Sequence, residues 1–83
     1  MPRADPQPGL ALAVRQLRTA QGLSQEELAN RAGVHLTWVS RIESGTSNPG
    51  WGNTKRIAHG LGIPHSTLAA YGEAKDRELA GGS

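Results

Sequence analysis

Residues 34–45 have the sequence VHLTWVSRIESG, in which hydroxyl and guanidinium groups recur at spacings that suit one face of a helix. On a helical wheel of about 100° per residue, Val39 and Ile42 lie on one side. The residues that point most directly away from that side are Thr37, Ser40 and Arg41. Hydroxyl and guanidinium groups hydrogen-bond to phosphates and base edges, and arginine binds guanine with two parallel bonds. The outward face is therefore suited to the groove of a nucleic acid.

Leu36 and Trp38 lie on the two flanks of the same predicted helix, where the inward face does not need them. Leu36 is either an isolated surface leucine, which is common, or part of a contact surface. Three interpretations of Trp38 stay open. It is a boundary side chain packed over the edge of the core, a contact to phosphate or sugar, or part of a protein interface.

Capping residues and glycines divide the chain into short helices. Apolar residues at helical spacing predict a first helix over about 10–21. Ser24 and Glu27 have the spacing of a capping box, in which each side chain accepts a hydrogen bond from the other's backbone N–H. A second helix therefore begins there and ends at Gly33, which favours a left-handed backbone. The third helix follows within one or two residues and ends at Glu43, so the two helices must cross at a large angle.

The remaining segments are less clearly specified by their own residues. Glycines weaken a fourth helix over about 50–60, because each costs roughly 1 kcal/mol relative to alanine inside a helix. We expect tertiary packing to form it, through Trp51, Ile57, Ala58 and Leu61. A short last helix is predicted over 66–71. Residues 72–83 have mixed charge without an apolar stripe and are expected to be loose, and residues 1–9, with three prolines, to be a flexible arm.

Composition limits the classes of protein that fit. A chain of 83 residues predicts one domain. The absence of cysteine excludes disulfides and thiolate metal sites. No apolar run is long enough for a membrane span or a signal peptide, so we expect a cytoplasmic protein with no membrane partner. Residues 10–72 carry six basic and three acidic side chains, which permits a polyanionic partner without requiring one.

Catalytic groupings are missing from the sequence. No pair of carboxylates, no serine with a plausible base and no phosphate-binding glycine loop is apparent. The three histidines His35, His59 and His65 lack the spacing of metal ligands. We therefore expect no enzymatic activity, no cofactor and no metal site. A small-molecule effector is not expected within this chain.

The stretch from Gln25 to Ile42 closely resembles the helix-turn-helix of the Cro and phage-repressor type, also called the xenobiotic-response-element family. The residues that carry the resemblance at their intervals are Leu28, Ala29, Gly33, Val34, Val39 and Ile42. It extends outward over about 10–71, and it implies an all-α, compact five-helix domain. In that family the second helix of the motif lies in the major groove of double-stranded DNA, with its N-terminal residues against base edges.

The resemblance also assigns roles by position. It implies base contacts by His35, Leu36, Thr37 and Arg41, with Leu36 against a thymine methyl group. It implies phosphate contacts by Gln25, Ser44, Thr46, Ser47, Asn48, Lys55 and Arg56. Ser40 and, as one of its three interpretations, Trp38 are further candidates for phosphate contacts. Gln25 would also steady the side chains that face the groove.

Two further positions follow from the same comparison with the family pattern. Arg18 and Glu43 match a pair that forms a buried salt bridge, and its role is structural. His35 stands where serine or threonine commonly caps the helix, so we expect the third helix to begin with a frayed turn or a water-mediated cap.

Two functions remain in competition. The first is a prokaryotic-type transcriptional regulator that binds a specific DNA duplex as a homodimer, since two half-sites about one helical turn apart supply affinity and specificity together. We expect its dimer surface on the last helix around Tyr71. The alternative is a protein-interaction module of the same fold, in which Leu36, Trp38 and also Trp51 bind another polypeptide, such as a toxin or a polymerase-associated factor.

Overall fold

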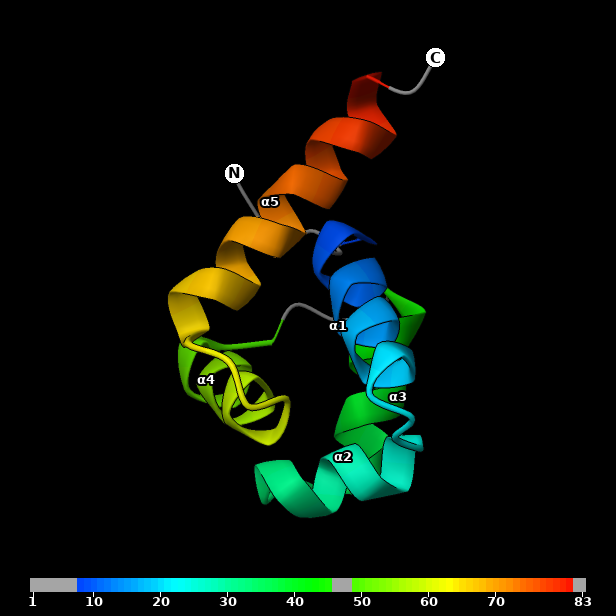
Figure 1. Ribbon diagram of the computed structural model, residues 1–83, viewed down its shortest axis with the longest axis vertical. Coiled ribbons are helices and arrows are strands. Elements are labelled where there is room, and N and C mark those ends of the chain that lie inside the picture. The colour runs from blue at the N-terminus through cyan, green and yellow to red at the C-terminus, as the bar shows by residue number, and fades with distance from the viewer. Residues whose placement is uncertain (1–7, 46–48, 82–83) are drawn as a thin grey trace, which may run out of the picture.

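The structure is a computed structural model that describes residues 8–45 and 49–81, and the described part contains five helices (Figure 1). The helices are α1 (Pro8–Ala20), α2 (Gln25–Ala32), α3 (Leu36–Ser44), α4 (Trp51–Gly60) and α5 (His65–Gly81). The predicted all-α, five-helix fold is confirmed. No helix among the described residues combines the length and the apolar character needed to cross a membrane.

All five helices contribute side chains to one hydrophobic core. The largest fully buried side chains are Leu28, Ile57, Leu68, Val14 and Val39. Each such side chain contributes about 1.5–3 kcal/mol by leaving water, so the short helices are held mainly by this shared burial. Val39 and Ile42 form the inward face of α3, as predicted from their spacing.

The junction between α2 and α3 has the local structure that the sequence predicts. Ser24 Oγ accepts a hydrogen bond from the Glu27 N–H, and the Ser24 N–H donates to Glu27 Oε1, which together make the capping box. At the other end of α2, Gly33 has a φ of 69°, a left-handed backbone conformation that residues with a Cβ rarely adopt. The Val34 N–H then bonds to the Ala29 carbonyl, which closes the helix end. This turn sets the direction in which α3 leaves α2.

The packing of α4 corrects one prediction. The side chain of Trp51 is 70% exposed and lies edge-on against His65, so it is not a core residue. Ile57, Ala58 and Leu61 are buried as expected, and they hold α4 together with a close approach to α2. A Cβ atom on Gly60 would lie 2.9 Å from the backbone N of Ala32. Glycine at this position therefore allows the two helices to touch, which offsets its conformational cost.

The expected loose tail over 72–83 is wrong as far as the structure describes it, because α5 continues to Gly81. Figure 1 shows α5 alongside α1, with its C-terminal end extending past the other helices. A Cβ on Gly72 would lie 3.4 Å from the Cα of Leu10, so the two helices are in close contact there. Asp76 Oδ1 also accepts a hydrogen bond of 2.8 Å from the Gly9 N–H. These contacts supply the packing that the segment's own sequence lacks.

The N-terminal arm predicted over 1–9 is wrong at its last two residues. Pro8 and Gly9 belong to α1, and residues 1–7 lie outside the described part. Proline suits the first position of a helix, where its missing N–H has no partner in any case. The Asp76 carboxylate binds the next N–H, so α5 caps the start of α1.

Candidate nucleic-acid interface

The outer face of α3 is open to solvent. The exposed polar residues on it are Thr37, Ser40 and Arg41, and the flanking Leu36 and Trp38 are 41% and 38% exposed. The Thr37 hydroxyl and the Arg41 guanidinium make no hydrogen bond or ion pair with the described part of the chain. Both groups are therefore available to an external partner without breaking a contact seen here.

An ion pair between α1 and α3 fixes how this face is presented. Arg18 Nε lies 2.6 Å from Glu43 Oε2, and its Nη2 lies 2.9 Å from Glu43 Oε1, which is a bidentate pair. The side chains are only 13% and 4% exposed. Arg18 also donates to the Leu23 carbonyl at 2.7 Å. The hydrogen bond to Glu43 raises the pKa of Arg18 above its ordinary value, so the pair stays charged.

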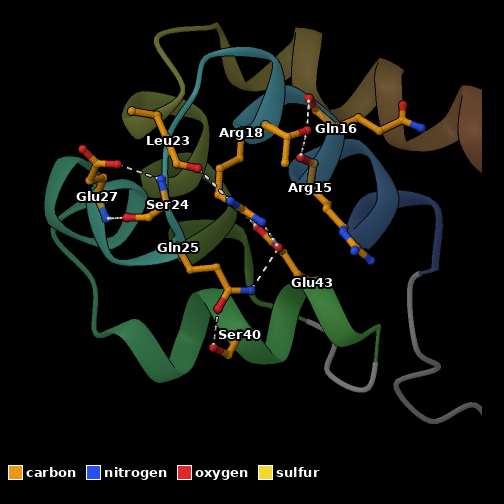
Figure 2. Close-up of polar contacts among 10 residues, drawn as sticks. Arg15, Gln16, Arg18, Leu23, Ser24, Gln25, Glu27, Ser40 and Glu43 are labelled. Atoms are coloured by element: carbon orange, nitrogen blue, oxygen red, sulfur yellow. Dashed lines mark hydrogen bonds and ion pairs between the residues drawn. The ribbon is translucent and has the colours of Figure 1, made fainter.

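The same carboxylate is connected to the outer face through Gln25. The Gln25 Nε2 donates to Glu43 Oε1 at 3.1 Å, and its Oε1 accepts from the Ser40 hydroxyl at 2.9 Å (Figure 2). Because a carboxylate only accepts, it determines which end of the amide faces Glu43 and which end faces Ser40. The first residue of α2 is thus tied to the middle of α3, as its expected steadying role requires.

The start of α3 differs from the expected frayed or water-mediated cap. His35 is the N-cap residue, and its Nδ1 accepts a hydrogen bond of 3.1 Å from the Thr37 N–H. An imidazole nitrogen here replaces the hydroxyl oxygen of a serine or threonine cap. The N-terminal turn of α3 is therefore capped by the protein itself.

The predicted phosphate contacts are spread over several segments. The exposed Ser44 ends α3 and donates to the Arg41 carbonyl at 2.7 Å. Lys55 and Arg56 are exposed on α4. The predicted contacts that lie outside the described residues are Thr46, Ser47 and Asn48. The structure therefore groups Gln25, Ser40 and Ser44, with Lys55 and Arg56 on a separate helix.

Arg15 borders the group formed by Gln25, Ser40 and Ser44, and it is not among the contacts predicted from the sequence. A shallow cleft of about 310 Å³ is lined by Arg15, Arg18, Gln25, Ser40, Glu43 and Ser44. Arg15 is exposed on α1, one turn before Arg18, and Figure 2 shows it beside the ion pair. Arg15 could have been predicted from its spacing of three residues from Arg18, because that spacing places both arginines on the same face of a helix.

Known proteins are similar to this chain over the region just described. A family model described as a helix-turn-helix domain matches residues 10–71. The chain belongs to this helix-turn-helix family. The match covers α2, the turn at Gly33 and α3, together with most of the surrounding helices. The resemblance to Cro and phage-repressor-type domains is thereby confirmed.

Two relatives of this helix-turn-helix chain are named as control proteins, and one of these, C.AhdI, is named as a restriction-modification controller. Control protein C.BamHI from Bacillus amyloliquefaciens is 41% identical over 59 residues, which cover 70% of this chain and 73% of that protein. The controller C.AhdI from Aeromonas hydrophila has a structure with 35% identity and a TM-score of 0.71, covering 75% of this chain and 94% of that one. Two longer curated relatives also match, and the chain spans 26% and 51% of their lengths.

A further solved structure bears on the fold alone. The wild-type controller C.Esp1396I gives a TM-score of 0.78 at 19% identity and covers 87% of this chain and 94% of its own. The agreement extends over the five-helix frame. By name, C.BamHI and C.AhdI are control proteins, and neither name is that of an enzyme.

Proposed function

We propose that this chain is a cytoplasmic transcriptional regulator that binds a specific double-stranded DNA sequence as a homodimer, with the exposed face of α3 in the major groove. The observation that carries the proposal is the outward, unpaired placement of Thr37 and Arg41 on a helix held by a buried ion pair. The similarity to the control protein C.BamHI and to the controller C.AhdI supports the same function.

Base recognition falls to exposed residues from the start of α3 as far as Arg41. Arg41 can donate two bonds to guanine O6 and N7, Thr37 can bond to either partner of a base pair, and Leu36 can contact a thymine methyl group. His35 lies at the very start of the helix. An arginine that reads a guanine contributes about 1–3 kcal/mol of discrimination at its base pair.

Backbone binding falls to the residues around the start of α2. Gln25 uses one amide N–H on Glu43, so its second amide N–H is free to donate to a phosphate. Its backbone N–H lies in the first turn of α2, where helix ends attract anions. The Ser40 proton is already donated to Gln25, so phosphate binding by Ser40 requires that bond to break. Arg15 adds a positive charge beside them, and Lys55 and Arg56 supply a second group of cations.

The homodimer is proposed to form through α5. Tyr71 is 45% exposed and lines a shallow cleft of about 420 Å³ with Ser66, Thr67, Ala70 and Ala74. The side chains other than Tyr71 are small, which allows another helix to approach closely. A two-fold pair of chains would present two copies of α3 to half-sites about one helical turn apart.

The test is DNA binding as a function of salt. Each neutralised phosphate contributes about 0.9 to the slope of log affinity against log salt, so affinity for duplex DNA should fall steeply between low and moderate salt. Arg41→Ala should lose discrimination at one base pair. Arg31→Ala removes the same charge from an exposed position in the last turn of α2 and is the matched control, because it lies outside the outer face of α3 and the proposed dimer surface and should leave the base preference intact.

A protein-interaction module is the competing function, and the exposed Leu36 and Trp38 are the observation that favours it. An apolar pair on the flanks of α3 would bind another polypeptide in place of DNA. Absent or salt-insensitive binding to duplex DNA would support this alternative and overturn the regulator.

A further inference from the structure

We propose that His35 is a specificity-determining residue that presents its Nε2–H to the major groove and selects guanine at one position of each half-site. The inference rests on the proposed function, because it concerns the same surface of α3. It adds a chemical reason why an imidazole, and not a hydroxyl, stands at the helix cap.

The cap fixes the tautomer of the ring. The Thr37 N–H donates to His35 Nδ1 at 3.1 Å, so Nδ1 carries no proton while the cap is intact. A neutral imidazole has one donor nitrogen and one acceptor nitrogen. The proton must therefore be on Nε2, and the far side of the ring is a hydrogen-bond donor.

The donor is free in the structure. His35 is exposed, and the described part of the chain offers no partner to its Nε2. The residue immediately precedes α3, on which Thr37 and Arg41 are exposed. The N-terminal end of a recognition helix is the end that approaches base edges. The Nε2–H thus lies at the end of α3 from which base contacts are made.

A single donor distinguishes bases by the acceptors that they present in the major groove. Guanine offers two adjacent acceptors, N7 and O6, whereas adenine places an N6 donor beside its N7. Cytosine presents a donor, and thymine presents O4 beside a methyl group. A fixed donor therefore favours guanine. A serine or threonine at this position would cap α3 equally well, but its hydroxyl lacks the reach of the imidazole ring.

Two variants separate the cap from the base contact. His35→Ser keeps a capping acceptor and removes the ring, and His35→Ala removes both. Selection of bound duplexes from a random pool, followed by titration of single-base variants, measures the preference. We expect both variants to lose roughly fivefold preference for guanine at one position, the worth of one hydrogen bond. Only His35→Ala should also lower the Tm, by about 4–8 °C for a cap in a domain of this size.

The tautomer can be measured without DNA. Long-range nitrogen–proton correlation spectra of the free protein should show a protonated Nε2 and an unprotonated Nδ1 for His35 at neutral pH. A proton on Nδ1, or His35→Ser binding with an unchanged base preference, would overturn the inference. If the wild-type protein binds no duplex at all, the proposed function fails as well, and the two failures are thereby distinguished.

Discussion

Breaking the ion pair between Arg18 and Glu43 from one side should destabilise the fold far more than removing both charges together. Arg18→Met leaves the Glu43 carboxylate, which is 4% exposed, with the Gln25 amide as its one remaining hydrogen-bond donor among the described residues. Stranding a buried charge costs about 3–5 kcal/mol. That loss is a large part of the roughly 5–15 kcal/mol that stabilises an ordinary domain.

The reverse variant should cost less. Glu43→Leu strands the Arg18 guanidinium, which is more exposed at 13% and still donates to the Leu23 carbonyl. We therefore expect a loss near the lower end, about 3 kcal/mol. In the double variant Arg18→Met with Glu43→Leu no charge is stranded, and apolar side chains of similar volume fill the site. Its loss should be smaller than that of either single variant.

Urea unfolding of the four proteins, followed by circular dichroism, gives the free energies for a double-mutant cycle. The cycle isolates the coupling between the two side chains. If the double variant loses as much as the two single variants combined, the residues are independent. The ion pair then does not hold α3 against α1, and the account of how the outer face is positioned is refuted.

Three further predictions concern stability. The hydrogen bond from the Ser24 N–H lowers the pKa of Glu27, so the stability that the ionised carboxylate contributes is present above the ordinary pKa of 4.5 and is lost as the pH falls through the lower folded value. Glu27→Gln should therefore flatten the fall of the urea midpoint on acidification, and Glu26→Gln at the exposed neighbour should not. Gly60→Ala should destabilise the fold because its Cβ would meet α2 at 2.9 Å, whereas the Cβ of Gly52→Ala would meet nothing within 4 Å and should stabilise α4 by up to about 1 kcal/mol. A higher Tm for both variants in thermal unfolding would contradict the close approach. Asp76→Ala should lower the free energy of unfolding in urea by about 1 kcal/mol because it uncaps α1, and Asp76→Asn should lower it less because its amide oxygen can still accept the hydrogen bond. Equal losses for the two variants would argue against the cap.

Local sequence signals were sufficient for the first half of the chain. The capping box at Ser24 and the left-handed glycine at Gly33 depend on residues a few positions apart, so the boundaries of α2 could be predicted. The inward placement of Val39 and Ile42 followed from helical periodicity. The Arg18–Glu43 pair required the family resemblance, because nothing in the local sequence brings α1 and α3 together.

Two of the errors arose where tertiary contacts decide the structure, and a third concerns a local helix cap. The C-terminal part of α5 has no apolar stripe, and the contacts that hold it come from α1, about 60 to 67 residues earlier. Trp51 was assigned to packing because tryptophan is usually buried in large part, but the contacts to α2 are made elsewhere on α4. The cap formed by His35 was missed because imidazole is an uncommon capping group, and only the geometry shows Nδ1 as the acceptor.

The central claim is that the exposed face of α3 meets the DNA groove, and backbone amide NMR tests it most directly. The protein would be titrated with a duplex selected from a random pool, and shifts would be followed residue by residue. The account predicts that the largest changes fall on residues 35–41 and on the first turn of α2. Saturable binding that leaves Thr37 and Arg41 unperturbed would contradict it.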